Sequence, residues 1–157
     1  MLKFNQSNRL PSPPKEQVEK LEQFYRITFP DNYKIFINEY NGAIPLNSTF
    51  EFDGNEYVLE TFLCILGDLK NDYDEGLYDI GVVTSQIFDR LVDDPNELGI
   101  RIIPIASLFA GDFICLDFRN SPEIPSICIW YHEQSEPFHP VTKKIANSFD
   151  EFLDILK

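Results

Sequence analysis

The most constraining feature of this sequence is a pair of apolar runs, at residues 113–118 and 126–132, with a turn around residues 120–122 between them. Each run has the length of a β-strand, and the turn predicts that the two runs form a hairpin. Both runs are apolar at consecutive positions rather than at alternate ones, which indicates that both faces of the hairpin are buried. We therefore expect this hairpin to lie at the centre of a sheet, with helices packed on it.

The N-terminal part of the chain has the signals of two short helices with a break between them. Ser12 is predicted to cap the first helix, because Pro13 and Pro14 suit a first turn in which backbone N–H groups need no partner. The break falls just before Pro30, since the residue that precedes a proline is disfavoured in the helical region. Pro30 then opens the second helix, and Gly42 is expected to end it in the left-handed conformation.

The middle and the end of the chain alternate between strand and helix patterns. Ser148 and Glu151 form a capping box that predicts the start of the last helix. Pro104 lies inside an expected strand and implies either a sheet edge or a bulge there. The other expected elements are a hairpin of strands 49–52 and 57–63 with its turn at 53–55, an acidic loop at 67–76, a helix at 77–91 and a strand at 101–105.

Together these patterns predict a single α+β domain, with a mixed, mainly antiparallel sheet of about five or six strands flanked by helices. A chain of 157 residues is long enough to bury the core of one such domain. We expect residues 1–13 to be a frayed N-terminus and residues 14–157 to form the domain.

The sequence contains no signal for export or membrane insertion that we can identify. The residues that follow Met1 do not form the apolar core of a signal peptide, and no apolar run approaches the length of a membrane span. The three cysteines, Cys64, Cys115 and Cys128, cannot all pair within the chain. We therefore expect free thiols and a cytoplasmic location.

Negative charge is concentrated in the middle of the chain. The whole chain has a formal net charge of −13, from 26 acidic and 13 basic residues. Between Glu51 and Glu97 there are 13 acidic residues and only two basic ones, so this block holds −11 of the net charge. Binding to nucleic acid or to an anionic membrane is disfavoured, because both need a basic surface. The block either attracts a basic protein or is simply a solvated face of the domain.

Three stretches of the sequence resemble the SUKH superfamily, which includes the yeast cell-wall-assembly regulators and many bacterial toxin-immunity proteins. They are residues 29–42, residues 104–117 and the last helix from residue 146, and the resemblance in order and spacing covers residues 14–157. The acidic segment at residues 68–94 matches no motif of that superfamily. The matching residues are Phe29, Pro30, Tyr33, Phe36, Asn41, Gly42, Pro104, Gly111, Asp112, Leu116, Asp117, Ser148, Phe149, Phe152 and Leu153.

The resemblance implies a protein that binds another protein, and not an enzyme. Members of the superfamily act mainly as immunity proteins, which neutralise a secreted toxin that is often a nuclease. Nuclease active sites are basic because they hold phosphate, so an acidic surface on the inhibitor would speed the encounter. The alternative within the same superfamily is a regulatory or scaffold module for protein interaction, with no toxin partner.

The charge pattern, rather than the resemblance, locates the candidate partner surface in the acidic segment. Tyrosines between the acidic residues suit interface anchors, although each of them also suits a packed ring with its hydroxyl in water. The candidate partner-binding residues are Asp68, Asp72, Tyr73, Asp74, Glu75, Tyr78, Asp79, Asp93 and Asp94.

Two aspartates at the central hairpin have alternative structural and catalytic interpretations. Asp112 follows Gly111 and is expected to accept hydrogen bonds from backbone amides in a turn. Asp117 lies on an apolar strand, where a buried carboxylate needs a partner such as Arg101 or Arg119.

We expect no cofactor, no metal and no catalytic site. His132 and His139 are the only histidines, and their spacing fits no metal-ligand template. No nucleophile with an adjacent base can be identified. A hydrolase that uses Asp112, Asp117 and His132 is the remaining alternative from a different functional class.

Overall fold

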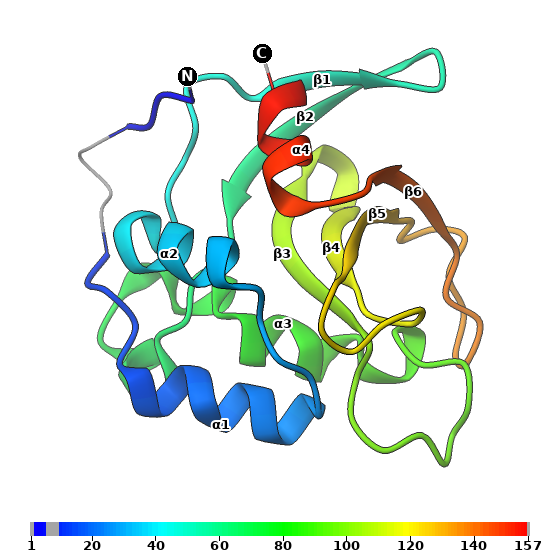
Figure 1. Ribbon diagram of the computed structural model, residues 1–157, viewed down its shortest axis with the longest axis horizontal. Coiled ribbons are helices and arrows are strands. Elements are labelled where there is room, and N and C mark those ends of the chain that lie inside the picture. The colour runs from blue at the N-terminus through cyan, green and yellow to red at the C-terminus, as the bar shows by residue number, and fades with distance from the viewer. Residues whose placement is uncertain (1, 6–9, 157) are drawn as a thin grey trace.

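The computed structural model describes residues 2–5 and 10–156 (Figure 1). The described helices are α1 (Lys15–Tyr25), α2 (Asp31–Tyr40), α3 (Ile80–Gln86) and α4 (Phe149–Ile155), with short 3-10 helices η2 (Gly67–Asn71), η3 (Asp74–Tyr78), η4 (Phe88–Arg90) and η5 (Phe109–Gly111). The described strands are β1 (Thr49–Phe52), β2 (Asn55–Phe62), β3 (Ile102–Leu108), β4 (Phe113–Asp117), β5 (Ser126–Trp130) and β6 (Thr142–Ala146).

The six strands form one sheet in which each strand pairs with the next one along the chain, in the order β1-β2-β3-β4-β5-β6. Every one of these pairings is antiparallel. Among the described residues, parallel pairing is confined to an isolated bridge between Cys64 and Asp79. The predicted α+β class and the predicted number of strands are confirmed.

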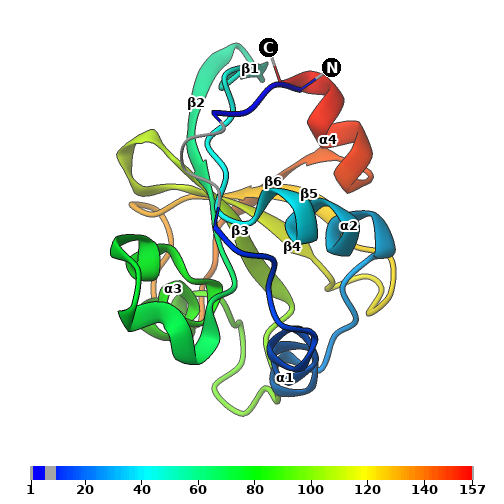
Figure 2. The same cartoon turned by 90° about the vertical axis from the view of Figure 1, so that its left-hand side faces the viewer.

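Helices lie on both sides of the sheet. In Figure 2, α1, α2 and α4 lie on one side of the central strands and α3 lies on the other. All seven residues of β3 are buried, as are the three middle residues of β4 and four of the five residues of β5. The hairpin of β4 and β5 is therefore buried on both faces, as its apolar runs predict.

Pro104 lies in β3, which has a neighbour on each side and is not an edge strand. The register between β3 and β4 shifts between Pro104 and Ala106, so a bulge occurs where the proline cannot donate a backbone hydrogen bond. Of the two alternatives that the proline left open, the bulge is the one observed.

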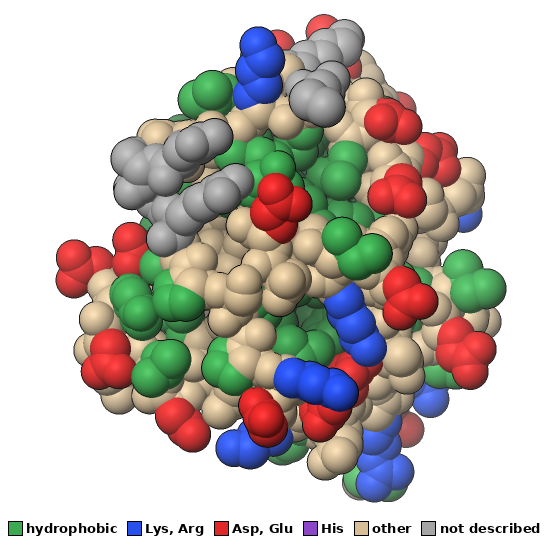
Figure 3. Space-filling model, turned by 60° about the vertical axis from the view of Figure 1, so that its left-hand side comes forward, with side chains coloured by type: hydrophobic (Ala, Val, Ile, Leu, Met, Phe, Trp, Pro, Cys, Tyr) green, Lys and Arg blue, Asp and Glu red, His purple; other side chains and the backbone are tan. Residues whose placement is uncertain are grey.

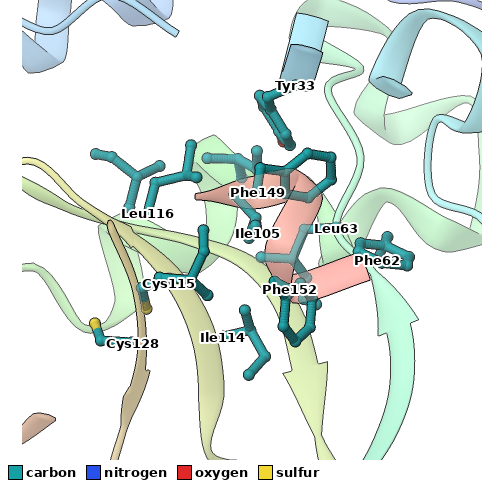
Figure 4. Packing of buried hydrophobic residues seen from close by; sticks show 14 of the residues in the cluster. Tyr33, Phe62, Leu63, Ile105, Ile114, Cys115, Leu116, Cys128, Phe149 and Phe152 are labelled. Atoms are coloured by element: carbon teal, nitrogen blue, oxygen red, sulfur yellow. The ribbon is translucent and has the colours of Figure 1, made fainter. Parts of the chain in front are cut away.

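Aromatic rings join the helices to the sheet. Phe149 of α4 lies 5.1 Å from Phe36 and 5.3 Å from Tyr33, both in α2, as measured between ring centroids. Figure 4 shows Phe149 and Phe152 directed into the same cluster as Ile105. The predicted start of α4 is confirmed, because the Ser148 hydroxyl accepts a hydrogen bond from the Glu151 amide at 3.1 Å.

The predicted Ser12 cap of the first helix is wrong. Helix α1 begins after Pro14 and has no side-chain cap, whereas the Ser12 hydroxyl donates a hydrogen bond to the carbonyl oxygen of Asn38 in α2. Within the expected frayed segment, the Phe4 ring stacks on Tyr40 with centroids 4.1 Å apart, and the fraying itself stays a prediction. Residues 1 and 6–9 of the expected frayed segment lie outside the described residues.

The predicted helix at residues 77–91 is shorter in the structure. Helix α3 occupies only Ile80–Gln86, and η4 follows it. The Asp79 carboxylate accepts a hydrogen bond from the Val82 amide at 3.2 Å, so it caps α3 and fixes its start. The expected loop at residues 67–76 contains η2 and the start of η3.

Candidate functional site

We call residues 67–78 the acidic lobe. It consists of η2, η3 and the two residues between them, and it lies next to α3 (Figures 1 and 2). The carboxylates of Asp68, Asp72 and Asp74 are exposed, whereas Tyr73 and Glu75 are half-buried. Six of the nine candidate partner-binding residues, including Tyr78, therefore lie together on this one short, hydrogen-bonded segment.

The acidic lobe also exposes large apolar side chains. Leu77 is 70% exposed, Tyr78 is 44% exposed and Leu69 is 40% exposed. Figure 3 shows acidic and hydrophobic side chains interleaved at the lower left, where the lobe lies. Leu77 begins the helix predicted at residues 77–91, but it lies in η3 with its side chain exposed, and no signal in the sequence singles out Leu69. Neighbouring exposed apolar side chains with polar groups around them are a feature of protein-binding surfaces.

Asp79 does not belong to the exposed surface, so its placement among contact residues is wrong. Its side chain is buried, with only 4% of the residue exposed. One carboxylate oxygen accepts hydrogen bonds from the amides of Leu66 and Gly67 at 2.7 and 3.1 Å, and the other accepts from Val82. Asp79 is therefore an internal acceptor that joins the start of the acidic lobe to α3.

Asp93 and Asp94 lie in a different place, beside a cleft of about 640 Å³ that the end of α1 and the turn after β4 also line. Glu97 lies in the same cleft and forms an ion pair with Arg101 at 3.3 Å. Burial raises the pKa of Glu97, and the nearby Asp93 raises it further. The cleft contains basic and acidic side chains together, with Arg119 among the former, whereas Lys70 is the single basic residue of the lobe.

A third group of carboxylates lies on the hairpin of β1 and β2, at the upper edge of the molecule in Figures 1 and 2. Glu51 and Glu56 face each other across its two strands, and Asp53 at its turn forms an ion pair with Lys143 at 2.8 Å. The acidic block that is continuous in the sequence is thus divided in space among the hairpin, the acidic lobe and the cleft. Only the lobe combines exposed carboxylates with several exposed apolar side chains.

The aspartates and histidines of the central hairpin form structural contacts. The Asp112 carboxylate accepts a hydrogen bond from the His132 amide at 2.8 Å, which agrees with the predicted role of binding backbone amides. Asp117 forms two hydrogen bonds with the Arg119 guanidinium, at 2.9 and 2.7 Å, and these raise the pKa of Arg119. Of the two predicted partners of Asp117, the structure pairs it with Arg119. Within residues 2–5 and 10–156, no group of three or more His, Cys, Asp or Glu side chains is placed to hold a metal ion.

The three cysteines are free and buried. Burial raises the pKa of the Cys64 thiol to about 12, and the nearby Asp79 adds to this effect. Burial and the adjacent Cys128 raise the pKa of Cys115 as well. Because the thiolate is the reactive form of cysteine, neither thiol is an activated nucleophile at neutral pH.

Comparison with known proteins agrees with this architecture. The model of the SUKH family that is described as SMI1-KNR4 cell-wall matches residues 15–153. This chain belongs to the SUKH superfamily. An SPbeta prophage-derived uncharacterized protein of Bacillus subtilis (strain 168), YokK, is 31% identical over 143 residues, which cover 88% of this chain and 71% of the relative. The resemblance stated from the sequence motifs is confirmed.

The SUKH match runs from the start of α1 into α4 and encloses the whole sheet and the acidic lobe. In the part of the chain that the structure describes, no helix combines the length and the apolar character that crossing a membrane requires.

Proposed function

We propose that this protein is an immunity-type binding protein that neutralises a cognate secreted toxin of the nuclease class in the cytoplasm. The observation that carries the proposal is the composition of the acidic lobe, where Leu77 and Tyr78 are exposed among the carboxylates of Asp68, Asp72 and Asp74. Membership of the SUKH superfamily supports it, because the resemblance to that superfamily implies a protein that binds another protein, and not an enzyme.

The two kinds of side chain in the acidic lobe would contribute to different steps of binding. Exposed carboxylates attract a basic surface over several ångströms and so raise the rate of association. Leucine and tyrosine side chains bury apolar area once the proteins touch and so slow dissociation. A nuclease offers the complementary surface, because its site must be basic to hold phosphate.

The proposal is tested by co-expressing this chain with the C-terminal domain of a secreted protein encoded by the neighbouring gene. We expect the two chains to purify together and the cells to survive a domain that kills them when it is expressed alone. The matched control is the same chain with Leu77→Asp and Tyr78→Asp, which removes the apolar contacts and keeps the surface acidic. Equal protection by the control variant, or no association of the parent chain, would contradict the proposal.

A second candidate function is a regulatory or scaffold module that has no toxin partner. The description of the matching family as SMI1-KNR4 cell-wall favours it, since that description names no toxin. The gene neighbourhood separates the two candidates. The absence of an adjacent gene for a secreted protein with a toxin-like C-terminal domain would favour the regulatory role.

We also infer that binding requires no catalysis, so substitutions at the hairpin aspartate and histidine should not abolish protection. Asp112 binds the His132 backbone amide, and the Arg90 guanidinium donates to the His132 carbonyl oxygen, so the His132 imidazole is not needed for either bond. We expect His132→Ala and Asp112→Asn to protect cells from the co-expressed domain as well as the parent chain does. Loss of protection by a His132→Ala protein that is folded, as judged by circular dichroism, would indicate a catalytic role.

A further inference from the structure

The acidic lobe is a closed loop: its beginning is bonded to Asp79 and its end to Cys64, and these two residues form a β-bridge with each other. At its beginning, the amides of Leu66 and Gly67 donate to the Asp79 carboxylate. At its end, the Cys64 amide donates to the carbonyl oxygen of Tyr78 at 2.9 Å, and the Ile80 amide donates to the carbonyl oxygen of Cys64 at 2.8 Å. Compact surface loops with adjacent ends are Ω-loops, and they frequently carry function.

The Asp79 carboxylate that closes this loop is compensated by backbone amides alone. It accepts three backbone hydrogen bonds, and among the described residues no Lys, Arg or His side chain forms an ion pair with it. A buried carboxylate is costly unless donors satisfy it, so the three amides and the carboxylate hold one another in place. Loss of one oxygen acceptor therefore releases the beginning of the acidic lobe, the start of α3, or both.

Two further contacts hold the acidic lobe in place: one between η3 and η2, and one between Asn41 and the backbone of Ile65 just before the lobe. A Cβ atom at Gly76 would lie 1.8 Å from the Lys70 carbonyl oxygen, so η3 packs directly on the backbone of η2. Below the lobe, the buried Asn41 side chain donates to the Ile65 carbonyl oxygen at 3.1 Å and accepts from the Ile65 amide at 2.9 Å. The exposed side chains of η3 are thus presented on a backbone that is held at its ends and at its centre.

We propose that Asp79 is a positioning residue for partner binding: its buried carboxylate closes the acidic lobe and so holds the exposed lobe side chains in the conformation that a basic protein surface recognises. This inference rests on the proposed function, and it adds the group that makes the site rigid. Pre-organisation raises affinity because a loop that is already ordered does not lose conformational freedom when it binds.

The closure is tested in the free protein by hydrogen exchange, measured by NMR. Asp79→Asn keeps the size of the side chain but replaces one acceptor oxygen by an amide donor. We expect the Leu66 and Gly67 amides, the Val82 amide, or all three to exchange about tenfold faster in this variant, while those of β3 stay within about twofold of the parent. The matched control is Asp154→Asn, which makes the same chemical change at an exposed position on α4 and should leave the lobe unaffected. Unchanged exchange at the three amides would overturn the closure.

The effect on recognition is tested with a decalysine peptide as a probe of binding to a basic surface. We expect Asp79→Asn to weaken binding of the peptide about threefold, although the buried carboxylate cannot touch it, and Asp154→Asn to change it less. Leu116→Ala, which destabilises the core away from the lobe, should leave the affinity unchanged. Faster exchange in the lobe together with unchanged decalysine affinity would overturn the positioning role. Failure of the co-expressed domain to associate would contradict the proposed function and leave the exchange result as it stands, so the two failures are distinguishable.

Discussion

Leu116→Ala is expected to lower the free energy of unfolding by about 2–5 kcal/mol, because it truncates a side chain at the centre of the core. Leu116 is 0% exposed and lies in β4, opposite Ile103 of β3 and Ile127 of β5. Figure 4 shows it within the cluster that α4 covers. Packing on both faces of the sheet leaves little room for neighbours to collapse into the space that the substitution creates. Chemical denaturation monitored by tryptophan fluorescence measures the change, since Trp130 is buried in the next strand.

The matched control for this substitution is Leu46→Ala, because Leu46 is 64% exposed. The same atoms are removed there, but they are not withdrawn from the core, so the free energy of unfolding should change by less than about 0.5 kcal/mol. Equal effects of the two substitutions would mean that the hairpin of β4 and β5 is not the centre of the core.

The parts of the fold that could be predicted from the sequence are those with local signals. The end of α2 follows from Gly42, which has a φ of +68° that other residues rarely adopt. The turn between β1 and β2 follows from Asp53 and Gly54, which both have positive φ, as the tight hairpin turn requires. The start of α4 follows from the Ser148 cap. Each of these signals acts within a few residues, so no knowledge of the tertiary structure is needed to interpret it.

The parts that could not be predicted depend on contacts between distant residues. Strand β6 contains Lys143 and Lys144, which are exposed, and it forms because β5 pairs with four of its five residues. Ser12 has the residue type of a helix cap, but α2 supplies a competing acceptor for its hydroxyl at Asn38. In both cases tertiary pairing overrides a local preference.

The candidate site was predicted in part, since the acidic lobe does gather carboxylates on one exposed segment. A charge count along the sequence cannot show that the hairpin of β1 and β2 and the segment before β3 place parts of the acidic block at opposite ends of the molecule. It also cannot show that Asp79 faces inward, because that depends on three backbone amides meeting at one point. The exposure of apolar residues such as Leu77 cannot be predicted from hydrophobic periodicity either, because periodicity assigns apolar residues to the core.

Neutralising three carboxylates of the acidic lobe is expected to slow association with the proposed toxin partner by about tenfold or more at low salt. The variant carries Asp72→Asn, Asp74→Asn and Glu75→Gln. Association should also lose most of its dependence on salt concentration, because the steering field is what salt screens. The free energy of unfolding should change little, since exposed carboxylates contribute little to stability. Stopped-flow binding at two salt concentrations measures both effects.

The control for this variant removes the same number of charges elsewhere, through Glu51→Gln, Asp53→Asn and Glu56→Gln on the hairpin of β1 and β2. If net charge alone attracts the partner, both triple variants should slow association equally, since each changes the net charge of −13 to −10. If the lobe directs the encounter, the hairpin variant should associate at nearly the parent rate, because its charges lie at the far end of the molecule. Screening at physiological salt acts over about 8 Å, so charges that far from the contact contribute little to the attraction. Equal slowing by the two variants would assign the acidic lobe to the solvated surface, and unequal slowing would identify it as the surface that meets the partner.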